Sequence, residues 1–300
     1  MTDHLPELTD GTVTLSPSTT EVGTVRFTIA RNGEEIGAIT LRRNGSATGE
    51  LTWHLDAAHR GRGSASIGVR LVTDWALTDA GLGGLGLGRI ECRVAAENEG
   101  ALRVATRAGL IREGVSRQAP GHGEATEIVV LARISTDPPV NDPQAFRSLL
   151  NSFLPRKRAI GQMLIRDTEG RVLLCHLTYK RDWDLPGGVV EVGESPHLAA
   201  SREIEEELAL TIPAGEIVLT DWLPPWGGWD DAVCLVFDGG VHSPGIVEQI
   251  QPEAREIRGA EFLTVEQIDE RAADFTARRI KAALAALDGG PRYTESGRRL

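Results

Sequence analysis

Short runs of alternating apolar and polar residues fill the first part of the chain from about Thr12. The stretch TVRFTIARNGEEIGAITLRR places Asn32-Gly33 between two such runs, which is a strong signal for a β-hairpin. A further strand is predicted from about Gly49 to Leu55, and apolar residues recur at helical spacing after about Ser64. The opening segment therefore predicts a series of β-strands that leads through a glycine-containing loop into a helix.

The pattern continues with a strand in RIECRV, a helix from about Glu99 that stops at Gly109, and a strand in EIVVLARI. The next residues, STDPPVNDP, are rich in turn formers, so we place a domain boundary near residue 140. Asp142 and Pro143 then suit the start of a short helix, QAFRSLLNSFL, which Pro155 would end.

The second half predicts strands in RAIGQMLIRD and GRVLLCHL, and a hairpin in IVLTDWLPPWGGWDDAVCLVFDGG. The tip of this hairpin carries Trp226 and Trp229, which could stack on a base or pack against the protein. EFLTVEQIDE and FTARRIKAALAALDGG predict a strand and a closing helix, and we expect the tail PRYTESGRRL to be loosely held. At 300 residues, the chain predicts an α/β (α+β) fold in two domains, each with its own core.

One stretch, GGVVEVGESPHLAASREIEEELAL, carries most of the candidate chemistry. Ser195 is a good helix N-cap, and Pro196 suits the first helical position. On that helix Glu203, Glu206 and Glu207 are related by i,i+3 and i,i+4 steps, so their carboxylates share one face. Like charges at this spacing destabilise a helix by about 0.2–0.5 kcal/mol per pair. A solvated acidic face and a site for a hard cation such as Mg²⁺ are the two interpretations.

Three further residues favour the metal site. Gly188, Glu194 and Arg202 stand in register with the acids in the spacing G-x5-E-x7-R-E-U-x-E-E, where U is apolar. This pattern closely resembles the box of the Nudix hydrolases, except that Ala209 stands where the family usually has Gly. Because Gly suits a left-handed helix exit and Ala does not, we expect the exit of this helix to differ in detail.

The resemblance implies an α/β/α sandwich that binds Mg²⁺ or Mn²⁺ and splits a diphosphate bonded to a nucleoside or another group. Arg202 would hold Glu194, and one of the box acids would help to deprotonate water. The metal-binding positions that the resemblance implies are Gly188, Glu203, Glu206 and Glu207. Beyond the box, the spacing does not choose an additional metal ligand among Asp230, Asp231, Glu253 and Glu256. Lys180 and Arg181 are candidates to meet a substrate phosphate.

Charge and composition narrow the range of partners. The net charge of −11 and a pI near 5.2 argue against duplex nucleic acid or an anionic membrane as the principal partner. The cysteines Cys92, Cys175 and Cys234 lack CxxC spacing and lie in apolar runs, which predicts buried reduced thiols. The start, MTDHLPELTD, lacks the apolar core of a signal peptide, and no apolar run approaches membrane length. We therefore expect a soluble cytoplasmic protein.

A second motif precedes the first predicted helix. Residues 60–65, RGRGSA, fit R-x-x-G-x-A, and a strand, a Gly-rich loop and a helix N-terminus in this order outline an anion site. A tight strand-to-helix turn is the alternative. The loop resembles the pyrophosphate-binding loop of the GNAT acetyltransferases, and RIECRVAAENEGALRVATRAGL resembles their second landmark, beside the pantetheine arm of acetyl-CoA. The cofactor positions that this resemblance implies are Leu55, Arg60, Gly61, Arg62, Gly63, Ser64, Ala65 and Asn98.

The stretch GELTWHLDAAHRGRG is similar to the branch that acetylates protein N-termini, including those of ribosomal proteins. In that branch Glu50 would occupy a candidate base position, with a peptide or amine as acceptor; a solvent-facing strand residue is the alternative. Two departures weaken catalysis. Only residues 16–23 separate the first two strands, where the family inserts two helices, and Ala105 stands where many members carry a Tyr that protonates the departing thiolate.

These resemblances predict a shortened GNAT-like domain over residues 1–136, a linker with a short helix over 137–152 and a Nudix domain over 153–300. We expect hydrolysis of a nucleotide-like diphosphate compound with Mg²⁺ or Mn²⁺, and acetyl transfer from acetyl-CoA in the first domain. In the alternative, the first domain is a non-catalytic acyl-CoA-binding or interaction module. A nucleoside triphosphate, a nucleotide sugar and ADP-ribose all remain open as substrates, and so does the oligomeric state.

Overall fold

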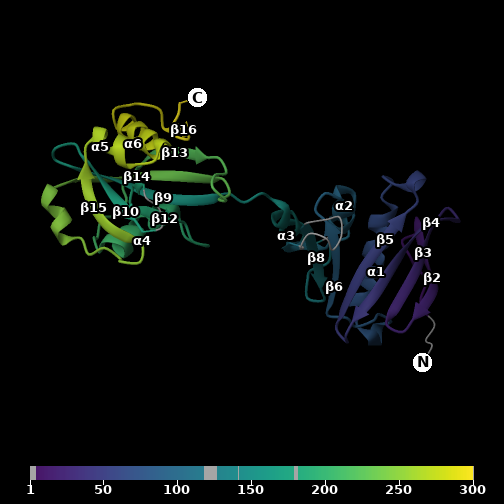
Figure 1. Cartoon of the computed structure of the whole chain (residues 1–300). Coiled ribbons are helices and arrows are strands. Elements are labelled where there is room, and N and C mark those ends of the chain that lie inside the picture. The colour runs from purple at the N-terminus through teal and green to yellow at the C-terminus, as the bar shows by residue number, and fades with distance from the viewer. Residues whose placement is uncertain (1–4, 118–126, 141, 179–181, 300) are drawn as a thin grey trace. The chain divides into compact units, whose positions relative to one another are not determined.

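A computed structural model describes residues 5–117, 127–140, 142–178 and 182–299 (Figure 1). Lys180 and Arg181 therefore lie outside the described residues. Contacts divide the chain into two compact units, Met1–Pro155 and Arg156–Leu300. The predicted short helix, α3 (Pro143–Phe153), is present and belongs to the first unit, where it packs against β7 (Ile111–Arg117). Asp142 caps it by accepting a hydrogen bond from the Gln144 N–H.

The first unit is built on a sheet in the order β1-β2-β3-β4-β5-β6-β8-β7, antiparallel except between β5 and β6. The remaining strands are β1 (Leu8–Thr9), β2 (Val13–Glu21), β3 (Thr24–Arg31), β4 (Glu34–Asn44), β5 (Thr48–Leu55), β6 (Arg89–Ala95) and β8 (Glu127–Ile134). The Asn32-Gly33 hairpin is confirmed: both residues have positive φ, as a tight hairpin turn requires. β2 runs directly into β3, so the two family helices are absent between them, as expected.

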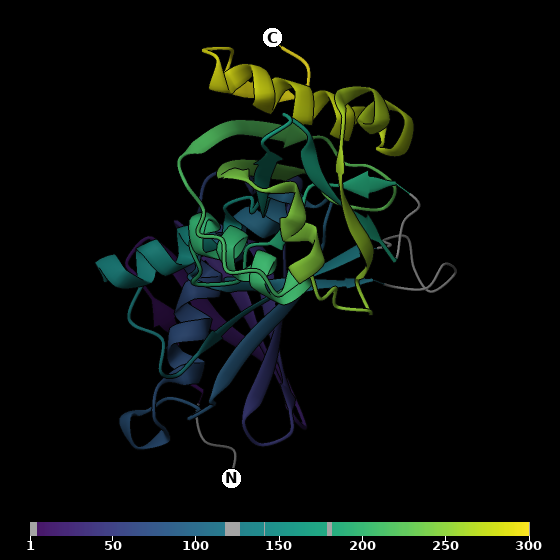
Figure 2. The same ribbon diagram turned by 90° about the vertical axis from the view of Figure 1, so that its left-hand side faces the viewer.

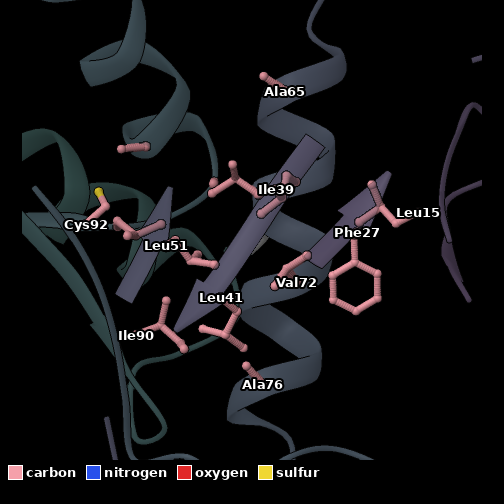
Figure 3. Close-up of a cluster of buried hydrophobic side chains, with 14 of the residues drawn as sticks. Leu15, Phe27, Ile39, Leu41, Leu51, Ala65, Val72, Ala76, Ile90 and Cys92 are labelled. Atoms are coloured by element: carbon pink, nitrogen blue, oxygen red, sulfur yellow. The ribbon is translucent and has the colours of Figure 1, made fainter. Parts of the chain in front are cut away.

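Helices α1 (Ser64–Leu77) and α2 (Glu99–Arg107) follow β5 and β6, with short 3₁₀ turns at Ala57–His59 and Ala80–Leu82. Figure 3 shows the core between α1 and the sheet, where Val72 and Ala76 meet apolar side chains of β3 and β4. The helix lies so close to the sheet that a Cβ at Gly68 would come within 2.8 Å of Ile39 Cδ1. This core burial holds the loop before α1 in place.

The second unit has a mixed sheet in the order β11-β10-β9-β14-β13-β16, with β12 beside β9 and β15 beside β10. Its strands are β9 (Arg158–Asp167), β10 (Val172–Leu177), β11 (Trp183–Asp184), β12 (Gly187–Val189), β13 (Ile217–Leu223), β14 (Ala232–His242), β15 (Ile257–Leu263) and β16 (Tyr293–Glu295). Its helices are α4 (Pro196–Leu208), α5 (Val265–Arg271) and α6 (Asp274–Leu287), with a 3₁₀ helix at Pro244–Gln249. The predicted strands and closing helix are therefore present.

Alternation along β9 builds two cores on opposite faces of this sheet. Met163 and Ile165 join the core that α4 covers, whereas Leu164 joins the core that contains Ile280 of α6. In both views α6, drawn in yellow, lies along one side of the unit (Figure 1; Figure 2). The unit is therefore the expected α/β/α sandwich, and the chain is a two-domain α/β fold.

The hairpin between β13 and β14 carries its two tryptophans at an exposed tip. Trp226 packs against Phe275 of α6 with ring centroids 5.6 Å apart, and the Arg158 guanidinium lies 4.8 Å from the centre of the Trp229 ring. All three cysteines are buried free thiols, as predicted. Within the described part of the chain, no helix is both long and apolar enough to cross a membrane.

The expectation of a loosely held tail is wrong. β16 pairs in parallel with β13, and Thr294 is fully buried. The Thr294 Oγ1 and the Gly297 N–H donate to Oδ1 of the buried Asp221 at 2.7 and 2.8 Å. The polar tail residues therefore donate the hydrogen bonds that a buried carboxylate needs. The composition of the tail does not reveal this role, because the carboxylate lies elsewhere in the sequence.

Candidate active site and cofactor pocket

Helix α4 presents the acids of the box. Ser195 caps it by accepting from the Leu198 N–H at 3.3 Å, and Pro196 is its first residue, as predicted. Ala209 adopts the left-handed conformation at the exit, with φ 55° and ψ 28°. The expected difference in the exit is therefore not seen; Ala takes the turn that Gly would favour, at a strain of about 1–2 kcal/mol.

Glu207 is the most deeply buried acid of the box, with 5% of its surface exposed. Its Oε2 accepts a hydrogen bond from the Gly187 N–H at 2.9 Å. Burial raises the pKa of Glu207 to about 8, although the Gly187 hydrogen bond opposes the rise. Negative charges on Glu203, Glu256 and Asp184 raise it further. The fold thus holds this carboxylate where ionisation needs a compensating cation.

Glu203 lies against the backbone of Gly188. A Cβ at Gly188 would come within 2.6 Å of Glu203 Oε1, so only glycine leaves room for the carboxylate. Burial raises the pKa of Glu203, and the neighbouring Arg202 lowers it. Gly188 and the helix acid Glu203, which the motif places at a set spacing in the sequence, are therefore in direct contact in the folded protein.

Arg202 links three carboxylates of the motif. Its Nε donates to Glu194 Oε1 at 3.0 Å, its Nη2 to Glu203 Oε1 at 2.9 Å, and its Nη1 to Glu206 Oε2 at 2.6 Å. These bonds hold the pKa of Glu194 below its usual range. Arg202 therefore connects the loop acid Glu194 to the helix acids and orients them toward one side of α4.

The arrangement of the box acids bears on whether they could hold a metal ion. In the described residues, no three His, Cys, Asp or Glu side chains lie close enough together to hold an ion. Arg202 accounts for part of this, because it binds Glu206, whose side chain is exposed. The chemistry still fits a hard cation: Glu203 and Glu207 are carboxylates whose charges repel each other, in a niche that the bare backbone of Gly188 keeps open.

The first unit holds a pocket where β5 and β6 separate. These strands pair only over Thr48–Glu50 and Arg89–Glu91, and both continue beyond that pairing. A pocket of about 480 Å³ lies beside the later residues of β5, the loop before α1 and the helix α2. The predicted cofactor residues that line it are Leu55, Arg60, Gly61, Gly63, Ala65 and Asn98.

Local geometry explains how the loop before α1 is built. Gly61 and Gly63 have φ values of 78° and 81°, a conformation that side chains disfavour, and Gly63 directly precedes α1. The Arg60 Nε donates to the Leu55 carbonyl at 3.0 Å, which ties the loop to the end of β5. Gly63 and the first-turn residues Ala65 and Ser66 line the pocket, so the N-terminus of α1 lies at its wall, an arrangement that suits an anion.

Two predicted cofactor residues, Arg62 and Ser64, do not line the pocket. The Arg62 carbonyl and the Ser64 Oγ both accept hydrogen bonds from Arg31 Nη1 at 3.2 Å, and Ser64 is buried. Asn98 caps α2 by accepting from the Ala101 N–H at 3.0 Å. Arg62 and Ser64 therefore support the loop, while Asn98 fixes the helix that forms the other wall of the pocket.

Comparison with protein families agrees with this arrangement. Residues 155–284 match the NUDIX domain, and residues 9–111 match the acetyltransferase (GNAT) domain. The chain joins a GNAT domain to a Nudix domain. Both parts resemble enzymes, a hydrolase in the second half and an acetyltransferase in the first.

Three curated relatives illustrate the two domains. The Nudix domain is 29% identical over 138 residues to a MutT-like protein of Streptomyces ambofaciens, covering 46% of this chain and 81% of the relative. An 86-residue match, 37% identical, relates 28% of the chain to 45% of the probable N-acetyltransferase YjcK of Bacillus subtilis. An 80-residue match, 36% identical, relates 26% of the chain to 38% of the ADP-ribose pyrophosphatase of Mycobacterium tuberculosis. The chain thus spans less than half the length of the last two.

In the Nudix domain, the structure distinguishes among the four candidates for an additional metal ligand that the sequence spacing could not rank. Asp231 pairs with Lys157, and the Asp230 carbonyl accepts from Arg158 at 2.9 Å. Glu256, in contrast, acts electrostatically on both Glu203 and Glu207. The Glu253 N–H donates to the Glu207 carbonyl at 3.0 Å, which docks this loop on the end of α4. Among these four acids, Glu256 is the one whose charge raises the pKa of both Glu203 and Glu207.

In the GNAT domain, Glu50 lies near the start of β5 and pairs with Arg42, whose Nη2 is 2.5 Å from its Oε2. The pocket instead takes the last three residues of that strand, including His54. Sequence reasoning missed His54, and also Arg103 and Arg107 of α2, which line the opposite wall. Helical spacing from Asn98 would have placed the two arginines one turn apart on a single face.

Proposed function

We propose that the Nudix domain hydrolyses a diphosphate bond in a nucleoside diphosphate-linked compound with bound Mg²⁺ or Mn²⁺. The observation that carries the proposal is the burial of Glu207 beside Glu203, where two carboxylates face the backbone of residues 187–188. Adjacent buried carboxylates require a positive partner to ionise together. Glu203, Glu206 and Glu207 would hold the metal together with Gly188, and Glu256 is the additional candidate.

When bound, the metal would polarise a bridging phosphate oxygen and lower the pKa of its water ligand. The chain supplies orientation. Gly187 holds one oxygen of Glu207 through its N–H, and Arg202 holds Glu194 and Glu203. Burial raises the pKa of Glu207 to about 8 in the metal-free site, so a bound cation would be needed to keep this carboxylate ionised near neutral pH, as a metal ligand must be.

The test is a panel of diphosphate compounds with Mg²⁺ or Mn²⁺, with products identified by mass. The panel includes nucleoside triphosphates, nucleotide sugars and ADP-ribose, the last because one relative is an ADP-ribose pyrophosphatase. Glu206→Gln should reduce turnover by about 10²-fold or more. Glu205→Gln is the matched control, because this exposed acid lies on the same helix but outside the motif. Folded wild-type protein that binds no Mn²⁺ and turns over no compound would contradict the proposal.

For the GNAT domain we propose acyl-CoA binding in the 480 Å³ pocket. The left-handed glycines of the loop, the N-terminus of α1 and Arg60 offer donors to a pyrophosphate, and α2 forms the other wall. Arg60→Ala should weaken acetyl-CoA binding by about 10–150-fold in calorimetry, since one charge-assisted hydrogen bond contributes roughly 1.5–3 kcal/mol. Arg43→Ala is the control, because this exposed arginine lies on β4 and outside the pocket.

Acetyl transfer is the second candidate, and His54 on the pocket wall favours it by offering a base. The direct β2–β3 hairpin and the pairing of Glu50 with Arg42 favour binding without transfer. Acetyl-CoA turnover with amine and peptide acceptors separates the two candidates. Release of CoA that depends on acceptor and is lost in His54→Ala supports transfer, and tight binding without any release supports a binding module.

A further inference from the structure

The backbone of residues 184–188 brings the two glycines of the Nudix site to its acids. The Gly187 N–H lies 2.9 Å from Glu207 Oε2, and a Cβ at Gly188 would come within 2.6 Å of Glu203. A displacement of this segment by 1 Å would break the first contact or obstruct the second. The segment has little regular structure of its own, because β11 has two residues and β12 three. Backbone pairing holds its two ends, Asp184 against Cys175 of β10 and Gly187–Val189 against β9, so side chains can add support between them, at Leu185 and Pro186.

The side chain of Gln162, on the central strand β9, supplies that support. Its Nε2 donates to Asp184 Oδ1 at 3.1 Å and to the Leu185 carbonyl at 3.3 Å. Next to it, the Met163 N–H donates to the Pro186 carbonyl at 3.0 Å. Gln162, Asp184 and Leu185 are buried, so bulk water does not compete for these hydrogen bonds.

Arg279 determines which way the Gln162 amide points. A glutamine amide accepts at one end and donates at the other, whereas a guanidinium only donates. The Arg279 Nη1 donates to Gln162 Oε1 at 2.8 Å, which leaves Nε2 facing the two acceptors at residues 184 and 185. With the amide reversed, Oε1 would face a carboxylate and a carbonyl, and Nε2 would face a cation. Asp221 fixes Arg279 in turn, through a 2.9 Å bond to Nε.

We infer that Gln162 and Arg279 are positioning residues for the Nudix site. Arg279 orients the Gln162 amide, and Gln162 holds Asp184 and Leu185, directly before the two glycines that contact Glu207 and Glu203. Neither residue belongs to the box; one lies on β9 and the other on α6. The catalytic consequence rests on the proposed function, whereas the positioning can be measured without any turnover.

Gln162→Met tests the inference in the full chain, because it keeps the side-chain volume and removes both hydrogen-bonding ends. The direct readout is hydrogen exchange of the Gly187 amide by NMR, without metal, which should become at least about tenfold faster. Affinity for Mn²⁺ and kcat on an identified substrate should fall by about 10–100-fold, as when groups that orient a metal site are removed. KM should change much less than kcat.

Thr294→Val is the matched control. It removes a buried hydrogen bond to Asp221 at the far end of the same polar cluster, so it loses comparable stability without touching residues 184–188. Gly187 exchange and Mn²⁺ affinity should stay at wild-type values in this variant. Arg279→Lys keeps the charge but cannot bond Gln162 and Asp221 together through a rigid fork, so it should reproduce the effect of Gln162→Met.

The inference is overturned if folded Gln162→Met exchanges Gly187 at the rate of wild type and of Thr294→Val. If Gln162→Met does not fold, the same comparison with Arg279→Lys decides. A wild-type protein that neither binds Mn²⁺ nor hydrolyses the panel would overturn the proposed function alone. In that case faster Gly187 exchange in the two variants would still support the positioning role.

Discussion

Gly188→Ala perturbs the Nudix site by adding a single carbon. The new Cβ would lie 2.6 Å from Glu203 Cδ and Oε1 and 2.7 Å from Oε2, whereas ordinary contacts begin near 3.4 Å. The carboxylate would have to retreat by about 0.8 Å, and it is already held by Arg202 at 2.9 Å. A misplacement of about 1 Å in a catalytic constellation can reduce the rate about 10²-fold. We therefore expect kcat to fall by about 10–100-fold, with little loss of stability, because the atoms that must move are the far end of a flexible side chain.

Gly259→Ala is the matched control on β15 of the same domain. A Cβ at Gly259 would meet no atom within 4 Å, so both activity and stability should stay near wild type. The assays are hydrolysis of a substrate found in the panel, Mn²⁺ binding and urea unfolding. If folded Gly188→Ala kept the wild-type kcat and Mn²⁺ affinity, the contact between Gly188 and Glu203 would have no role in the site.

Three further outcomes are expected. Ala209→Gly should raise the free energy of unfolding by about 0.5–1 kcal/mol. The substitution removes the strain of a left-handed alanine, and the greater conformational entropy of glycine in the unfolded chain offsets part of this gain; a lower urea midpoint would contradict the expectation. Burial raises the pKa of Cys92 to about 12 and that of Cys234 to about 11, so a thiol reagent at pH 8 should label the protein only after unfolding. Because unfolded thiols ionise near pH 9 while these stay protonated, stability should also decline as pH rises above 9. Asp221→Ala should lower the unfolding free energy by about 3–5 kcal/mol, since it removes the hydrogen-bonded carboxylate of the buried Arg279 and leaves it only Asp184, 3.7 Å away; a loss below 1 kcal/mol would refute that assignment.

The two candidate sites differ in how far local sequence could predict them. In the Nudix box, the helix cap at Ser195 and the shared face of the acids follow from backbone geometry within a few residues. In the GNAT loop, Gly61 and Gly63 mark positive φ before a helix, which is also a local property. The base candidate Glu50 is harder to judge from sequence, because its pairing with Arg42 depends on the register of β4 and β5.

The amino-acid sequence by itself determined the hairpin at Asn32-Gly33, the helix starts and the spacing that places the box acids beside Gly188. Each of these depends on φ and ψ preferences or on the helical period over a short span. Only the tertiary structure decided that Arg279 bonds to Gln162, that the charge of Glu256 acts on Glu203 and Glu207, and that the C-terminal tail docks on a buried acid. Those contacts join residues far apart in the chain. Sheet order and helix packing determine which groups become partners of a buried polar group, and a local sequence pattern contains no information about either.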